Sequence, residues 1–221
     1  MLKTNILYKT IFGVGLVTIL SLGYAFINQD EVKTSPKLDS PEKTFENNYN
    51  VFSLEVPESM NFAGETVPLD QPDIYERMDR ELLVNTYWQS NGILLIKRAK
   101  KYFPLIEPIL KANGVPDDFK YLAVAESGLT PIVSPAGATG FWQIMKSTAR
   151  EYGLEVNSNV DERYHIEKAT QVACEYLKEA KEKFGTWTLA AASYNAGMAG
   201  ISNQMERQKA KGYYNLLLNE E

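Results

Sequence analysis

The pattern of apolar and polar positions changes twice along the 221 residues of the chain. Residues 10–27 form a run of eighteen residues without a charge. Residues 28–72 show no long apolar periodicity. From residue 73 onward apolar positions recur every three or four residues, which is the period of a helix. The pattern therefore predicts an N-terminal hydrophobic segment over residues 1–27, a linker over 28–72 and a helical domain over 73–221.

The N-terminal hydrophobic segment is long enough to cross roughly 30 Å of hydrocarbon as a helix, at the lower edge of the usual range. Lys3 and Lys9 precede the uncharged run, and Asp30 and Glu31 follow it, so the positive-inside tendency exports the rest of the chain. Residues 23–25 (GYA) also form a small-x-small cleavage site. The sequence thus predicts either a membrane anchor or a cleaved signal peptide. Both export the domain. An anchor would hold it in the cell envelope, on the periplasmic side of the inner membrane, and cleavage would give a secreted protein.

The linker is acidic and rich in proline. It holds five of the chain's ten prolines and nine Asp and Glu against three Lys, so it carries a charge of −6. This composition is typical of a tether that lets a domain reach away from a membrane. The alternative is a partly ordered arm that wraps the domain, with residues 51–56 (VFSLEV) as one short strand.

The helical pattern of the third segment is clear enough to place individual helices. One begins near Ile74, and further apolar runs cover residues 92–112, 119–125, 166–184 and 187–192. Asn113 with Gly114, and later Gly185, are typical helix stops. No alternating strand pattern competes in this region. The predicted fold class is all-α, with a small irregular insert between Gly128 and Thr139.

The composition of the chain excludes several classes of binding partner and catalytic site. Lys and Arg total 23 against 28 Asp and Glu, a net charge of −5, which argues against nucleic acid as a partner because such proteins concentrate a basic face. The one cysteine, Cys174, excludes an internal disulfide and a Cys-rich zinc site. The one histidine, His165, leaves no Ser-His-Asp triad and no His-based metal site. We therefore expect no metal and no cofactor. Asp and Glu carboxyl groups remain as the candidate catalytic groups.

Glu126 is the carboxylate that the pattern singles out. It lies one helical turn beyond Leu122 and Ala123 and two turns beyond Phe119, and it continues their apolar face. Burial there favours the neutral acid and raises the pKa of the carboxyl. A neutral carboxylic acid near pH 7 can protonate the leaving oxygen of a glycosidic bond. The alternative is a helix-terminal Glu that reaches water or accepts backbone N–H bonds.

Two further segments carry candidate binding residues. Residues 134–140 (SPAGATG) form a loop of small residues that allows close approach of a ligand, and Trp142 and Gln143 follow it. Stacking on Trp142 and hydrogen bonds to Gln143 would suit N-acetylated sugars, although Trp142 is equally well explained as a core anchor. Tyr194 and Asn195 lie at a later helix end, where a structural role is the alternative.

Three motifs resemble those of the family 1 lytic transglycosylases, whose catalytic domains are similar to goose-type lysozyme. They are Glu126 with Ser127, residues 137–143 (GATGFWQ) and residues 194–197 (YNAG). Residues 160–163 (VDER) are most similar to the branch of membrane-bound lytic murein transglycosylase D. The resemblance covers residues 73–214 and implies a lysozyme-like all-α domain.

The resemblance also implies an activity and a set of site residues. Glu126 would be the catalytic acid in cleavage of the β-1,4 bond between N-acetylmuramic acid and N-acetylglucosamine of peptidoglycan, leaving a 1,6-anhydro end. The implied substrate-binding residues are Ser127, Gly137, Gly140, Trp142, Gln143, Met145, Tyr194 and Asn195. The absence of Asp and Glu between Ser127 and Arg150 agrees with a cycle that uses one acid. A hydrolytic muramidase and an inactive peptidoglycan-binding protein remain the alternatives.

The chain departs from the family pattern in two places. Where the branch usually has Asp-Pro, this chain has His165 and Ile166, which we interpret as a changed helix start at a solvated position. The branch also carries a final helix and carbohydrate-binding repeats after the apolar residues 213–218. Neither follows here, so we expect a catalytic domain that is shortened at its C-terminus.

Overall fold

The computed structural model describes residues 52–87 and 89–217. The predicted N-terminal hydrophobic segment lies outside these residues. Within them, no helix is both long enough and apolar enough to cross a membrane.

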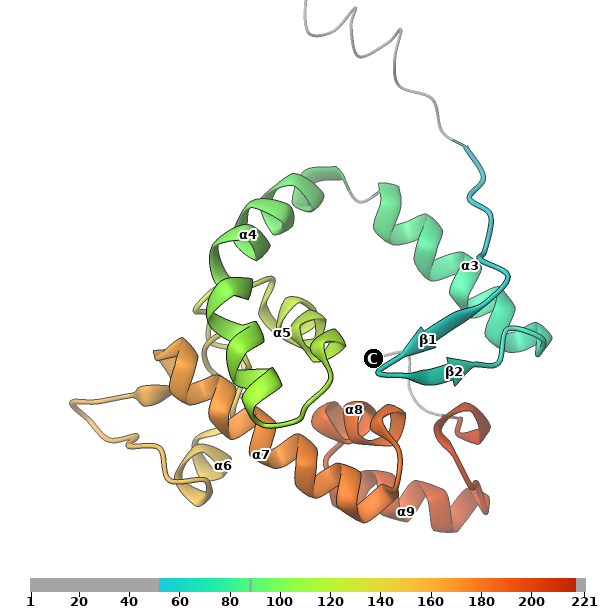
Figure 1. The fold of residues 1–221 in the computed structure, drawn as a ribbon. Helices are drawn as coiled ribbons and strands as arrows, with labels where there is room; N and C mark the ends of the chain where they lie inside the picture. Colours follow the sequence, from blue (N-terminus) through green and yellow to red (C-terminus); the bar gives the residue numbers. More distant parts are fainter. Residues whose placement is uncertain (1–51, 88, 218–221) are drawn as a thin grey trace, which may run out of the picture. The chain divides into compact units, whose positions relative to one another are not determined.

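The described residues form a helical domain with one small hairpin (Figure 1). The strands are β1 (Met60–Phe62) and β2 (Glu65–Val67). The α-helices are α3 (Pro72–Tyr87), α4 (Gln89–Ala112), α5 (Lys120–Ser127), α6 (Lys146–Glu151), α7 (Ile166–Phe184), α8 (Trp187–Ala196) and α9 (Met198–Gln208). Three 3-10 turns add η1 (Asp117–Phe119), η2 (Glu162–Tyr164) and η3 (Tyr213–Asn215). The all-α prediction is confirmed.

Local signals set both ends of α7 and the start of α8 where the sequence placed them, whereas α8 continues to Ala196, four residues beyond the predicted run. The exposed His165 caps α7, because its Nδ1 accepts a hydrogen bond from Lys168 N. Gly185 ends the helix with a left-handed φ of 79°, a conformation that costs glycine little. Thr186 then caps α8 by accepting from Leu189 N.

The main core lies where α4, α5 and α7 meet the segment that follows α5. Helix α7 packs against both α4 and α8 (Figure 1). Ile106 and Leu110 of α4, Phe119 of η1 and Leu177 of α7 are fully buried around Trp142. A smaller cluster joins Leu189, Ile201 and Leu216 at the C-terminal end. The core therefore surrounds the part of the chain that carries the candidate motifs.

The hairpin of β1 and β2 is part of this domain, although the sequence placed it in the linker. The antiparallel register pairs Met60 with Val67. Ala63 N at the turn donates to Asp118 Oδ2 at 2.6 Å, and the Phe62 ring packs edge-on against Phe119. Residues 52–57 contain no strand, so within them the strand suggested at 51–56 is not formed. The last residues of the linker thus agree with the alternative of an ordered arm.

Glu65 attaches the hairpin to the N-terminus of α8. Its carboxylate accepts hydrogen bonds from Trp187 N at 2.5 Å, from Thr188 N at 2.9 Å and from Lys181 Nζ at 3.1 Å. Burial alone would raise the pKa of Glu65, but these hydrogen bonds lower it below its ordinary value. An anion is favourable at this end of a helix because the free N–H groups and the helix dipole are positive there.

We expect Glu65→Ala to lower the free energy of unfolding by about 1–2 kcal/mol near neutral pH, because two backbone donors of α8 lose their acceptor. A carboxylate with a lowered pKa stabilises the fold only while it is ionised. The difference between wild type and variant should therefore shrink as pH falls through the folded pKa of Glu65. Urea unfolding between pH 3 and 7 measures this, with the exposed Glu58→Ala as the control. An equal loss in both variants would contradict the capping role.

Candidate active site

Glu126 lies in the last turn of α5, immediately before the helix ends. Gly128 terminates the helix in the left-handed conformation with φ of 58°, and its N–H donates to Val124 O. Phe119 and Ala123 on the same face are fully buried. Glu126 itself is partly buried, so its carboxyl lies where the apolar face reaches the surface.

The Glu126 carboxyl is desolvated, and no cation or hydrogen-bond donor among the described residues compensates for its burial. Burial raises its pKa above the ordinary value for Glu, which confirms the direction expected from the sequence. Among the described residues, no hydrogen bond or ion pair to the carboxyl is found. The alternative of a carboxylate that accepts backbone N–H bonds is therefore not observed in this part of the chain. An acid with a raised pKa and no partner is suited to donate a proton to a ligand.

Ser127 contacts the protein interior rather than a ligand site. It is buried, and its Oγ lies 2.8 Å from Phe141 O and 3.1 Å from Ala123 O. Thr130 N donates back to this Oγ at 3.3 Å. The structure thus corrects the predicted substrate contact of Ser127: its hydroxyl ties the end of α5 to the segment before α6.

The irregular insert predicted after Gly128 is present, and side-chain hydrogen bonds hold it together. Isolated bridges pair Val133 with Thr139 and Thr139 with Ile144. Gln143 Nε2 donates to Gly140 O at 2.8 Å and to Ile132 O at 3.1 Å. Gln143 also has a left-handed φ of 45°, which is unusual for a residue with a Cβ. We call residues 132–145 the site loop; its last residue, Met145, is 42% exposed.

Trp142 is a core residue, and its predicted role as a sugar platform is wrong. Its side chain is fully buried, and Nε1 donates to Thr170 Oγ1 at 2.8 Å. A ring without exposed surface cannot stack on a sugar. The core anchor, which the sequence left open as the alternative, is the role that the structure supports.

Tyr194 connects α8 to the site loop beside Glu126. Its hydroxyl donates to Trp142 O at 2.8 Å. Burial raises the pKa of the Tyr194 phenol well above its usual value, and the nearby Glu126 charge raises it further. Tyr194 and Glu126 are thus close enough to interact electrostatically. Asn195, the next residue, is exposed.

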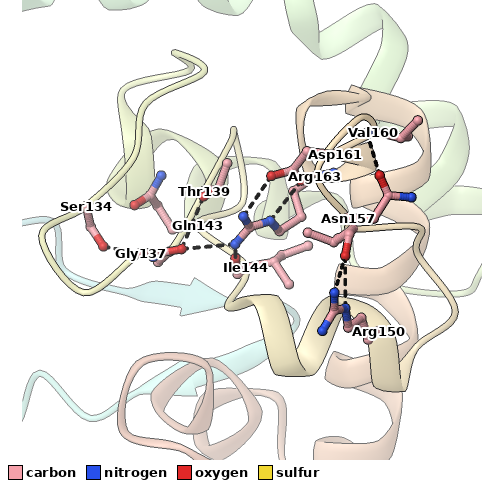
Figure 2. Close-up of polar contacts among 12 residues, drawn as sticks. Ser134, Gly137, Thr139, Gln143, Ile144, Arg150, Asn157, Val160, Asp161 and Arg163 are labelled. Carbon is pink, nitrogen blue, oxygen red and sulfur yellow. Dashed lines mark hydrogen bonds and ion pairs between the residues drawn. The ribbon is translucent and has the colours of Figure 1, made fainter.

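Arg163 holds the site loop from the opposite side, and the sequence did not single it out for this role. Figure 2 shows its guanidinium between Asp161 and two loop carbonyls. Nη1 donates to Gly137 O at 2.9 Å and to Ile144 O at 3.1 Å, while Nε and Nη2 donate to the two oxygens of Asp161 at 2.9 and 2.7 Å. These hydrogen bonds from Arg163 lower the pKa of Asp161. The Asp-x-Arg spacing was the available signal, but it does not reveal burial.

Gly140 is required by the close approach of the Arg163 backbone. A Cβ built on Gly140 would lie 2.2 Å from Arg163 O, and the φ of Gly140 is 82°. Gly137 has a similar φ of 86° but open space around it. Of the two predicted glycines, Gly140 is fixed by packing, whereas the space beside the Cα of Gly137 is open.

No group of three or more His, Cys, Asp or Glu side chains is arranged to hold a metal ion within the described ranges 52–87 and 89–217. Cys174 is fully buried in α7, where burial raises the pKa of its thiol to about 12.

The sequence matches the family model described as the transglycosylase SLT domain over residues 104–217. The chain belongs to this family. Two curated relatives, both named membrane-bound lytic murein transglycosylase D and both from Escherichia coli strains, are 32% identical to it over 156 residues. The alignment covers 68% of this chain and 34% of each relative, so it spans about a third of their length.

The SLT match contains every site residue discussed above, from Glu126 to Asn195. It begins inside α4, at residue 104, so the hairpin and α3 precede it. The hairpin lies outside the family match. Hydrogen bonds of Glu65 and Asp118 join it to α8 and η1, which lie within the match.

We expect Gly140→Ala to lower the free energy of unfolding by about 3 kcal/mol or more, because the added methyl group both strains the backbone and overlaps Arg163 O. Gly153→Ala is the matched control. Its φ is 85°, but open space surrounds it, so only the strain of about 1–2 kcal/mol applies. Denaturant unfolding of the two variants measures the difference. Equal losses would show that the contact with Arg163 can relax.

Glu126→Gln should change the pH dependence of stability in a defined direction. At low pH the carboxyl is neutral in both the folded and unfolded chains. As pH rises past the unfolded pKa of about 4.3, the unfolded chain ionises first, because burial raises the pKa in the folded chain. Wild type then loses stability that the variant keeps. Thermal melts should nearly coincide at pH 4 and favour the variant at pH 7. A markedly less stable variant at pH 7 would identify Glu126 as an ionised structural residue.

Proposed function

We propose that the chain is a peptidoglycan lytic transglycosylase that cleaves the β-1,4 bond between N-acetylmuramic acid and N-acetylglucosamine. The observation that carries the proposal is the partly buried Glu126 carboxyl with a raised pKa and no partner among the described residues. Membership of the SLT family and the printed names of both relatives support the same reaction.

In the proposed reaction, Glu126 gives its proton to the oxygen that leaves as the C4 hydroxyl of N-acetylglucosamine. The bond between this oxygen and C1 of the muramyl ring breaks. The Glu126 carboxylate then takes the proton from the C6 hydroxyl of the same ring while O6 bonds to C1. The product is a 1,6-anhydro end, and Glu126 is again neutral. No water is consumed, which distinguishes this reaction from hydrolysis.

The arrangement of the other acids supports a cycle with a single carboxylate. Ordinary glycosidases use a second carboxylate within about 5–10 Å of the acid. Asp161 forms an ion pair with Arg163, and the hydrogen bonds from Arg163 lower the pKa of Asp161. Glu162 contacts Lys168 and accepts from Glu155 N. Both carboxyl groups are thus engaged in the structure of η2.

The remaining site residues are proposed to bind the glycan strand. The open space beside the Cα of Gly137, the exposed Met145 and the exposed Asn195 are available for contacts. Gln143 and Gly140 shape the site loop from within. Tyr194 positions Trp142 O and, through it, the loop beside Glu126.

We further propose that the protein acts in the cell envelope, with its catalytic domain on the periplasmic side. The hydrophobic run of residues 10–27 with preceding lysines supports an anchor or an export signal. The printed names of the relatives describe membrane-bound enzymes. The proposed catalytic unit comprises residues 73–221 together with the hairpin that packs against it.

Digestion of purified peptidoglycan tests the reaction. We expect muropeptides whose muramyl ends are one water lighter than hydrolysis products, as measured by mass spectrometry. Glu126→Gln should reduce their release by about 10²- to 10⁴-fold, because the amide cannot donate the proton. Glu182→Gln, at an exposed position of α7, should match wild type.

Two other outcomes would contradict this function. Hydrated reducing ends as the main product would identify a hydrolytic muramidase. A wild-type protein that binds glycan strands but releases no fragments would identify a peptidoglycan-binding protein.

A further inference from the structure

A groove lies at the C-terminal end of the helix that carries Glu126. It has a volume of about 270 Å³ and is formed by α4, through residues 94–102, and by Leu129, Thr130 and Pro131 after α5. Arg98 Nη1 donates to Gly128 O, the carbonyl of the residue that ends α5, at 3.0 Å. The first lining residue after α5, Leu129, is therefore three residues beyond Glu126.

Three cations line this groove, and no carboxylate does. Lys97, Arg98 and Lys101 come from one face of α4. The chain has no Asp or Glu from residue 82 to 106 and none from 127 to 150, so neither lining segment supplies a counter-charge. In a chain with a net charge of −5, this is a local concentration of positive charge.

The two lysines of the groove are free to bind an anion. Lys97 and Lys101 are exposed, and no ion pair to either is found among the described residues. Lys101 Nζ lies 4.8 Å from the centroid of the Tyr102 ring. Lys120, by contrast, contacts both Glu107 and Asp117. Arg98 uses one of its five N–H groups on Gly128 O and keeps others for a ligand.

We propose that this groove binds the carboxylates of the peptide stems that branch from the muramyl residues of peptidoglycan. This inference rests on the proposed function. A stem leaves the muramyl ring through its lactyl group, next to the bond that Glu126 would cleave, and it carries free carboxylates. The exposed Leu94 and the exposed Pro131 offer apolar surface to the peptide between its charges. The groove thus selects glycan strands that still bear their stems.

Binding by the full chain tests the site independently of catalysis. The probes are a synthetic stem peptide with free carboxylates and the same peptide with its carboxylates converted to amides. Exposed ion pairs are individually weak, so Lys97→Gln with Lys101→Gln should weaken binding of the charged peptide by about 5- to 30-fold. Lys100→Gln with Lys111→Gln, two exposed lysines of α4 outside this groove, should leave it unchanged. The amidated peptide should bind weakly to every protein.

Cleavage assays then compare peptide-bearing strands with strands whose stems an amidase has removed. The groove variant should raise KM for peptide-bearing strands by the same factor, with kcat unchanged, and should match wild type on stripped strands. Equal loss on both substrates, or no loss on either, would overturn the inference. So would unaltered peptide binding with reduced binding to vesicles of anionic lipid, which would assign the groove to a membrane surface. Failure of wild type to cleave either substrate would refute the proposed function, whereas the peptide-binding result would stand by itself.

Discussion

The site loop keeps its shape because a buried guanidinium donates hydrogen bonds to two of its backbone carbonyls. Arg163 bonds to Gly137 O and Ile144 O, and Asp161 balances its charge. Removing one partner of such a pair leaves a buried charge uncompensated, which is far more costly than the pair is stabilising. Gly140 fits against the Arg163 backbone only because it lacks a Cβ. The loop beside Glu126 therefore depends on a residue that need not touch substrate.

The contrast among the carboxylates supports Glu126 as the proposed catalytic acid. Glu65 caps α8, Asp161 pairs with Arg163, and Glu162 contacts Lys168, and the pKa of each is lowered. Burial raises the pKa of Glu126, and no such partner is found for it within the described residues. Structural acids are held ionised by donors, whereas Glu126 is desolvated and left without them. A fold that satisfies its other buried groups tolerates this exception where function requires it.

Charge and polarity are arranged around Glu126 in a way that fits a branched, anionic polymer. The site loop up to Met145 contains no charged residue, so the reacting bond would meet neutral surface. The groove at the end of α5 is cationic. Neutral sugar and anionic peptide would thus meet different surfaces near the end of α5.

From the sequence we could predict five of the helices, several of their ends and Glu126 as the candidate acid, because these depend on neighbours a few residues apart. The helical period, the caps at His165 and Thr186 and the turn at Gly185 are all local. Only the tertiary structure decided which way Trp142 and Ser127 face and where the hairpin packs. Glu65 meets α8 more than a hundred residues away, with a separation of 122 positions to Trp187, and Arg163 meets Gly137 across 26 positions. Burial and long-range partners arise from chain packing, which no local period encodes.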